Sequence, residues 1–202
     1  MRRTAHFIFL LLSLALCSML FTGCSFTTKK KSRGDGAPNV ELNVLEIPNA
    51  VPKVEVISRH GNPPFYTIKG KRYYVLDSAR GFKQRGIASW YGTLFHKKTT
   101  SSGEPYNMYQ MTAAHKTLPL PCYARITNLK NHKSIIVKIN DRGPFRPGRI
   151  VDLSYAAAKK LDIHGIAPVE LKTVPPYPYH REVPFRYYRI ATLSSHSKAR
   201  AL

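Results

Sequence analysis

The chain has 202 residues, enough for one moderate domain with flanking segments. It carries 32 Lys and Arg residues against 11 Asp and Glu residues, a formal net charge of +21. This balance predicts attraction to polyanions, which include nucleic acids, anionic lipid headgroups and acidic cell-wall polymers, and it disfavours cationic partners.

Residues 1–24 have the features of an export signal. Arg2 and Arg3 precede the apolar run from Phe7 to Thr22, which is shorter than the roughly 20 residues that span a bilayer. The ending FTGC resembles the lipobox of bacterial lipoproteins, in which the cysteine, here Cys24, is lipid-modified and becomes the mature N-terminus. Ser25, by resemblance to bacterial sorting rules, then points to the outer membrane, facing the periplasm. The alternative is an uncleaved signal anchor.

Cysteine usage follows from this interpretation. Cys17 would leave with the signal and Cys24 would carry lipid, so that Cys122 is the one cysteine left. An intramolecular disulfide and a zinc site built on a thiol pair are then excluded. Cys122 stands at the start of an apolar-alternating run, which favours a small buried hydrophobic role.

Three segments flank the predicted core. Residues 25–61 are Lys-rich, then Gly- and Pro-rich without a sustained period, and predict a flexible, disordered basic tether. Residues 62–85 hold two β-rich runs around a Lys-Gly-Lys turn, a hairpin signal. Residues 175–202 form a basic tail rich in Tyr and Pro, for which we expect disorder or a polymer-binding arm.

Residues 86–174 read as short strands with one helix. Strands are predicted at 87–91, 123–129, 134–139, 149–153 and 169–174, and 111–118 could begin as a strand or as one helical turn. The polar segment 96–106 should be an exposed loop. Ser154 is a good N-cap for the helix YAAAKKLDI, and Gly165 should stop it. So many short strands with so little helix predict a small closed barrel, since closure removes strand edges.

The acidic residues of this region suggest where chemistry could occur. Asp141 and Asp152 stand at or inside apolar runs of the stretch IIVKINDRGPFRPGRIVDLS, where a carboxylate costs free energy unless it is paired or used. Glu104 lies in a Gly- and Pro-rich turn, and His115 follows an Ala pair. The structural alternatives are a surface turn for each Asp and a satisfied core histidine for His115.

Familiar constellations for other chemistries are missing from the sequence. There is no GxSxG, HExxH or phosphate-cradling glycine loop, and the histidines lack metal-ligand spacing, so we expect no metal and no cofactor. What remains is acid–base work by one or two carboxylates and a histidine, the chemistry of glycosidic bond cleavage.

Several motifs of the sequence, in unbroken order, resemble those of the rare lipoprotein A family. They are GIASWYG (86–92), TTSSGEPYNMYQMTAAHKTLPL (99–120), ARITNL (124–129), VKINDRGPF (137–145) and GRIVDLSYAAAKKL (148–161). The resemblance implies a six-stranded double-psi β-barrel with one short helix. It also implies endolytic lytic transglycosylase activity on peptidoglycan glycan strands, between N-acetylmuramic acid and N-acetylglucosamine, with 1,6-anhydro ends and a preference for strands that lack stem peptides.

The family's active-site Glu, His and Asp fall on Glu104, His115 and Asp141. We expect Asp141 to act as acid and then base, with its pKa raised by the apolar strand, and Glu104 and His115 to orient the sugar or stabilise positive charge. Trp90, Tyr91, Phe95 and Tyr106 could offer flat faces to sugar rings or could equally belong to the core. Arg142, which should point away from Asp141, and Asp152 are further candidates for substrate contact; Asp152 could instead brace the barrel.

Two other functions compete with catalysis. An expansin-like barrel could bind peptidoglycan without cutting it, and the positive charge alone would suit a nucleic-acid binder. The export signal disfavours nucleic acid, so the expected partners are glycan strands and, through Cys24, a membrane; proteins of the division site are possible partners.

Overall fold

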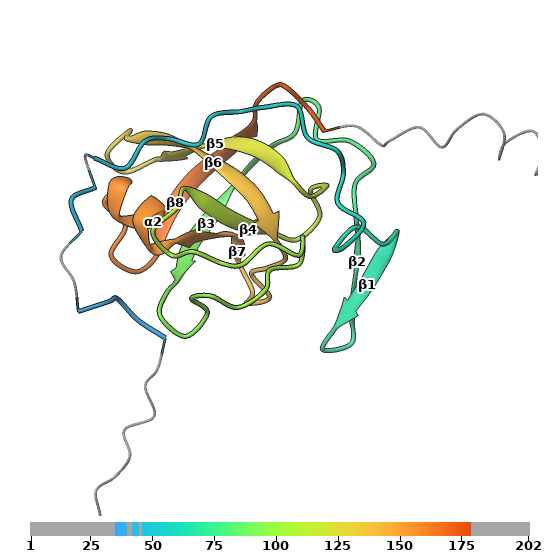
Figure 1. Ribbon diagram of the computed structural model, residues 1–202, viewed down its shortest axis with the longest axis horizontal. Coiled ribbons are helices and arrows are strands. Elements are labelled where there is room, and N and C mark those ends of the chain that lie inside the picture. Colours follow the sequence, from blue (N-terminus) through green and yellow to red (C-terminus); the bar gives the residue numbers. More distant parts are fainter. Residues whose placement is uncertain (1–34, 40–41, 45, 179–202) are drawn as a thin grey trace, which may run out of the picture. The chain divides into compact units, whose positions relative to one another are not determined.

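The computed structural model describes residues 35–39, 42–44 and 46–178, and most of its strands close into one barrel (Figure 1). The barrel strands are hydrogen-bonded in the order β3, β7, β4, β6, β5, β8. Their bounds are β3 (Lys83–Tyr91), β4 (Thr112–His115), β5 (Cys122–Asn128), β6 (Ser134–Asp141), β7 (Arg149–Ser154) and β8 (Ala167–Thr173). The prediction of a mainly β chain with a six-stranded closed barrel and one short helix is confirmed for the part of the chain described here.

Strand direction decides which residues meet at one end of the barrel. β3 pairs with β7 and β4 pairs with β6 in parallel, each with a register shift, while the other barrel pairings are antiparallel. Because β4 and β6 run parallel, their C-terminal residues, His115 and Asp141, lie at the same end of the barrel. This topology brings the TAAH and NDRGP motifs together.

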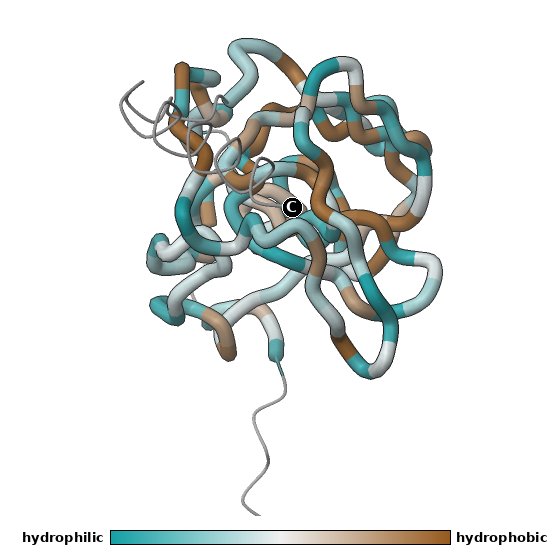
Figure 2. The backbone as a smooth tube through the Cα atoms, turned by 90° about the vertical axis from the view of Figure 1, so that its right-hand side faces the viewer, coloured by the Kyte–Doolittle hydropathy of each residue, from teal (hydrophilic) through white to brown (hydrophobic). Residues whose placement is uncertain are grey.

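The core is filled by alternate residues of the barrel strands. In β6, Ile135, Val137 and Ile139 are buried, while the residues between them are only partly buried. Figure 2 shows that hydrophobic and hydrophilic stretches are interspersed along the chain. Full burial of such an aliphatic side chain contributes about 1.5–3 kcal/mol relative to exposure. Cys122 is 1% exposed and free, which confirms its predicted role as a small buried residue.

The helix is α2 (Tyr155–Lys160), and its N-terminus is as predicted. Ser154 is the N-cap, and its Oγ accepts a hydrogen bond of 3.2 Å from Ala157 N. Three consecutive alanines of the helix are buried, which allows close packing against β7. The helix ends earlier than expected, because Asp162 adopts a positive φ of 60° well before Gly165.

Two predictions about the segment before the barrel have different outcomes. The hairpin is present as β1 (Phe65–Ile68) and β2 (Lys71–Tyr74), with Lys69 and Gly70 at positive φ in the turn. The expected flexible tether, however, includes ordered chain: Ala50 N donates to Ile136 O, and Ser58 N donates to Leu120 O. We call residues 46–61 the N-terminal strap. Nothing in the sequence indicated these contacts, because backbone hydrogen bonds to a barrel strand require no particular side-chain pattern in the segment that makes them.

No helix in the described part of the chain is long and apolar enough to cross a membrane. The predicted signal, the lipid-modified Cys24 and most of the basic tail lie outside the described residues.

Candidate active site

A cleft of about 650 Å³ lies at the end of the barrel where β4 and β6 terminate. Its wall combines aromatic side chains from β3 and the following loop with acidic and basic side chains from β6, β7 and the turn between them. The residues that matter most for its chemistry are Trp90, Phe95, Ala114, Asp141, Arg149 and Asp152. The cleft thus brings together three of the predicted aromatic residues, Trp90, Tyr91 and Phe95, and both of the suspected aspartates.

Asp141 and Asp152 flank Ala114 in one row across three strands. Ala114 of β4 is in register with Asp141 of β6 on one side and with Asp152 of β7 on the other. Two strand spacings separate the aspartates, so their Cα atoms lie roughly 10 Å apart. The methyl group of Ala114 leaves the space between them open. Such a pair of carboxyl groups on opposite sides of a gap suits chemistry on a sugar placed between them.

Asp141 is held by donors from two segments. Its Oδ1 accepts hydrogen bonds from Ser101 N at 2.8 Å, Ser101 Oγ at 2.7 Å and Arg142 N at 2.8 Å. All three contacts reach the same oxygen, which leaves Oδ2 as the atom for a ligand in the cleft. Three donors around one oxygen are the surroundings in which a carboxylate anion is stable.

Asp152 has a different environment. Its Oδ1 accepts a short hydrogen bond from Ser89 Oγ, in the neighbouring strand β3. Burial raises the pKa of Asp152, and this effect outweighs the Ser89 hydrogen bond and the charges of Arg149 and Lys116, which lower it. The cleft therefore holds one carboxyl with three donors and one whose protonated form is favoured by desolvation.

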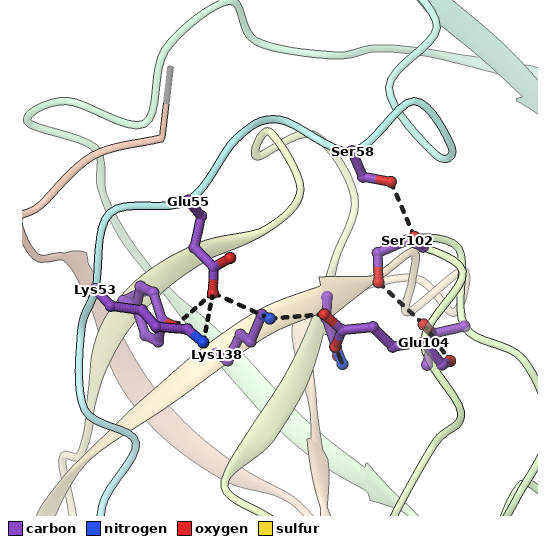
Figure 3. Close-up of polar contacts among 9 residues, drawn as sticks. Lys53, Glu55, Ser58, Ser102, Glu104 and Lys138 are labelled. Atoms are coloured by element: carbon purple, nitrogen blue, oxygen red, sulfur yellow. Dashed lines mark hydrogen bonds and ion pairs between the residues drawn. The ribbon is translucent and has the colours of Figure 1, made fainter. Parts of the chain in front are cut away.

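Glu104 lies outside the cleft, in a network around Lys138 of β6 (Figure 3). Its Oε1 accepts from Lys138 Nζ at 2.6 Å, and its Oε2 accepts from Asn140 Nδ2 at 2.9 Å. Lys138 Nζ also lies 3.2 Å from Oε1 of Glu55, in the strap. Burial acts to raise the pKa of Glu104, but the hydrogen bonds from Asn140 and Lys138 lower it overall. We call Glu55, Glu104, Lys138 and Asn140 the lysine network.

The lysine network supports Asp141 through a loop. Residues 99–105 fold back on themselves, and Ser102 N donates to Asn140 O at 3.1 Å. Ser101, in the same loop, donates to Asp141. Glu104 thus fastens the loop to β6, and the loop in turn fixes the carboxylate of Asp141. In this arrangement Glu104 does not line the cleft itself.

His115 is also away from the cleft and is only 2% exposed. Its Nδ1 accepts from Thr117 N and Leu118 N at 3.2 and 3.1 Å, which leaves Nε2 to donate to Gln84 Oε1 at 3.1 Å. Burial, together with the charge of Arg142, lowers the pKa of His115 to about 3. The neutral ring therefore shapes the turn after β4, and it lies against Phe82.

Arg142 points away from Asp141, as expected, but its guanidinium is fully used within the protein. It donates to Gly61 O, His115 O, Leu118 O and Asn62 Oδ1, at distances between 2.6 and 3.1 Å. Arg142 also lines the cleft, so the expected substrate contact through this residue stays a prediction. Its guanidinium ties the residue after Asp141 to the turn that His115 shapes.

The comparisons with known proteins agree with this fold. A family model described as lytic transglycolase matches residues 83–171. A protein of Pseudomonas aeruginosa strain PAO1, named endolytic peptidoglycan transglycosylase RlpA, is 53% identical over 144 residues, which are 70% of this chain and 42% of that protein. Namesakes from Vibrio cholerae and Neisseria meningitidis serogroup B are 46% and 49% identical, over 79% and 63% of this chain and 61% and 54% of their own lengths.

The chain belongs to the rare lipoprotein A family. It spans between 42% and 61% of the length of these curated relatives. Among solved structures, the Streptomyces papain inhibitor is 23% identical, with a TM-score of 0.38 over 47% of this chain and 96% of that one. The predicted family and double-psi barrel are confirmed.

Within this rare lipoprotein A barrel, the four predicted aromatic residues differ in their access to a ligand. Trp90 and Phe95 line the cleft, and Phe95 is 45% exposed. Tyr91 also lines the cleft, but one face of its ring stacks on Tyr106 with centroids 4.1 Å apart. The Tyr91 hydroxyl is buried beside the Thr112 side chain, so it is not open to the cleft. Tyr106 is 2% exposed and donates to Tyr91 O, which makes it a core residue.

Sequence reasoning missed four residues of the site. Ser101 and Ser89 hold the two aspartates from outside the cleft lining. Arg146 and Arg149 line the cleft, and their side chains make no hydrogen bond or ion pair with a described residue. The loop sequence TTSSGE signalled Ser101 only weakly, since small polar residues are usual in any exposed loop. In a chain with 32 basic residues, nothing in the sequence singled out these two arginines.

Proposed function

We propose that this chain is an endolytic lytic transglycosylase of peptidoglycan. It would cleave the β-1,4 bond between N-acetylmuramic acid and N-acetylglucosamine and leave a 1,6-anhydro end. The observation that carries the proposal is the pair Asp141 and Asp152 on either side of Ala114, in the cleft of a barrel whose relatives are named endolytic peptidoglycan transglycosylases.

The reaction needs a proton donor and a proton acceptor. Asp152, with its raised pKa, is suited to protonate the glycosidic oxygen as the bond from that oxygen to C1 breaks. The C6 hydroxyl of the muramic acid then attacks C1, and its proton passes to Asp141. The negative charge of Asp141 also stabilises the positive charge that develops at C1. This division replaces the expectation that Asp141 alone acts first as acid and then as base.

Glu104 and His115 act on this reaction as positioning residues. Glu104 secures the loop that carries Ser101, and His115 shapes the turn whose carbonyl oxygens hold Arg142. Errors of about 1 Å in the placement of a catalytic group can lower rates about a hundredfold. The two residues are therefore needed for activity without contacting the sugar.

Sugar rings would be held by the aromatic side chains of the cleft. Phe95 and Trp90 offer apolar ring surface against which the C–H face of a pyranose packs.

A preference for strands without stem peptides has a physical basis in the cleft. Removal of the stem peptide leaves a free lactyl carboxylate on each muramic acid residue, whereas a peptide-bearing residue has an uncharged amide there. The unpaired guanidinium groups of Arg146 and Arg149 are suited to bind such a carboxylate. Replacing both with Gln should weaken binding to stripped strands and change binding to a neutral N-acetylglucosamine oligomer little.

The location of the reaction follows from the proposed substrate. Peptidoglycan lies outside the inner membrane, so the chain would be exported, as its first 24 residues predict. Lipid on Cys24 would hold it at the outer membrane, facing the periplasm. The net charge of +21 would favour the anionic wall polymer and lipid surface, while division-site proteins are a further class of possible partner.

The deciding experiment is an analysis of reaction products. Stem-peptide-free glycan strands are incubated with the full-length protein, and the soluble products are examined by mass spectrometry. Internal fragments with 1,6-anhydromuramic ends support the proposal. Strands that bind without release of such fragments would identify a non-catalytic binding module, and fragments with hydrolysed reducing ends would identify a hydrolase.

A further inference from the structure

The cleft contains a third carboxylate, which comes from the segment before the barrel. Asp35 lines the cleft, although it lies 48 positions before the first residue of β3, Lys83. Gly92 N lies 3.0 and 2.9 Å from its two carboxylate oxygens, and Leu94 N donates to Oδ1 at 3.1 Å. Backbone N–H groups that converge in this way form an anion-binding concavity.

The backbone around this concavity is built for close approach. Thr93 N donates to Gly36 O at 3.0 Å, so three successive amides, 92–94, face the Asp35–Gly36 segment. A Cβ atom at Gly92 would lie 2.1 Å from Gly36 O, a distance that no side chain could tolerate without a shift. Gly92, the last residue of GIASWYG, therefore allows another carboxylate-bearing segment to reach these amides.

Asp35 works against the substrate that the cleft is proposed to bind. Asp141 and Asp152 are already present, and the free guanidinium groups are those of Arg146 and Arg149. The negative charge of Asp35 cancels part of the attraction of these arginines for an anionic sugar. Asp35 also accepts the hydrogen bonds of the Gly92 and Leu94 amides, so these two donors are occupied when a ligand arrives.

We propose that the amides of Gly92 and Leu94 form a carboxylate subsite of the glycan cleft, which Asp35 fills until the lactyl carboxylate of a muramic acid residue displaces it. The inference rests on the proposed function, because the ligand is part of the glycan. Exchange of one carboxylate for another keeps both N–H groups hydrogen-bonded, so the displacement leaves no buried donor unsatisfied. The predicted lipid attachment at Cys24 is 11 positions before Asp35, so the segment that leaves the subsite is the one that leads to the membrane.

The test compares strand binding by the double variant Asp35→Ala/Asp141→Asn with binding by the single variant Asp141→Asn. Asp141→Asn is present in both so that strands are not cut, and both are full-length proteins in detergent. The probes are stem-peptide-free strands, chitohexaose, which has no carboxylate, and free stem peptides, whose carboxylates are not lactyl groups. Asp35→Ala should bind stripped strands about fivefold more tightly, equivalent to roughly 1 kcal/mol, and chitohexaose equally well. Free stem peptides should not compete.

A matched control and a second readout keep the result unambiguous. Asp77→Ala removes an exposed carboxylate away from the cleft and should leave every affinity unchanged. In nuclear magnetic resonance spectra, stripped strands should shift the Gly92 and Leu94 amide signals of Asp35→Ala, and chitohexaose should not. If Asp35→Ala is unstable, Asp35→Asn, which keeps an oxygen acceptor, serves in the same assay and should tighten binding in the same direction.

Three outcomes would overturn the subsite. The first is equal affinity for stripped strands of the proteins with and without Asp35→Ala. The second is that Asp35→Ala increases the affinity for chitohexaose as much as for stripped strands, which would indicate that Asp35 only blocks the cleft sterically. Competition by free stem peptides would assign the subsite to a peptide carboxylate. Since these are binding measurements on a chain that does not cut, their failure is separate from failure of the proposed reaction, which product analysis of the unaltered chain reports.

Discussion

The carboxylates of this barrel fall into two regions with opposite electrostatics. In the cleft, Asp152 is partly buried and accepts a hydrogen bond from a serine hydroxyl, and its pKa is raised by desolvation. In the lysine network, Glu104 is hydrogen-bonded to Asn140 and Lys138, and its pKa is lowered despite partial burial. Both carboxylates lie in motifs of the same family, but desolvation prevails over hydrogen bonds and nearby charges only at Asp152, where it favours the protonated form.

The difference shows that ionisable residues in the motifs of one family can have different roles, some in the cleft and some in supporting segments. His115 and Glu104 lie on the segments that hold Asp141 in place, whereas Asp152 shares the cleft with it. A raised pKa in a cleft suits a proton donor, while a charge satisfied by lysine suits a brace. Substitutions in the two regions should therefore have different effects on catalysis and on stability.

The largest effect is expected for the proposed proton donor. Asp152→Asn should lower the rate of 1,6-anhydro product release by about 10²–10⁴-fold, because general acid catalysis contributes that much. Binding of stripped strands should change little, and the melting temperature should not fall, since a neutral amide replaces a partly buried acid. Asp141→Asn should lower the rate comparably, and near-normal activity of Asp152→Asn would return the acid role to Asp141.

His115→Ala tests the residues that support Asp141 from outside the cleft, and the quantity measured is stability. Loss of a buried ring with three hydrogen bonds should reduce the free energy of unfolding by about 3 kcal/mol, measured by urea denaturation. The unaltered protein should also lose stability as the pH falls from 6.5 toward 3, because the unfolded chain then binds a proton that buried His115 does not. The variant should lack this part of the pH dependence.

A direct role of His115 would give a different pattern. If His115→Ala lost activity about a hundredfold while its free energy of unfolding stayed unchanged, the ring would contact the substrate. His115 would then belong with the cleft residues rather than with the supporting residues.

Glu104→Gln should have a smaller effect, of about tenfold on kcat with little change in KM, because the loop that carries Ser101 would hold Asp141 less firmly. Glu55→Gln is the matched control, since it removes a charge from the same lysine without touching the loop. Equal losses of kcat in the two variants would show that the charge of the lysine network matters, rather than the anchoring of the loop.

The smallest effect is a shift in the pH profile. Activity should fall as the pH rises through the pKa of Asp152, because the proton donor is then ionised. The hydrogen bond from Ser89 lowers that pKa, so Ser89→Ala should raise it and move the alkaline limb to higher pH. An unchanged limb would mean that another group controls it; Ser78→Ala, at an exposed serine, is the control.

Much of the fold was predictable because it depends on local patterns. The apolar alternation of residues 134–139, the Lys-Gly turn of the hairpin and the Ser154 cap each specify their element within a few residues. The strap at 46–61 was not predictable, since it is held by isolated contacts to residues far along the chain, such as the backbone hydrogen bond to Ile136 O and the ion pair of Glu55 with Lys138. Its sequence, rich in proline and polar residues, is also typical of a linker.

The sequence by itself determined the closed barrel, the family and the short set of ionisable residues from which a site could be built. Only the tertiary structure decided how those residues divide. The register of β4 with β6 and β7 sets Asp141 and Asp152 on either side of Ala114. Burial and neighbouring charges, which depend on contacts between residues far apart in the chain, then raise the pKa of Asp152 and lower those of Glu104 and His115.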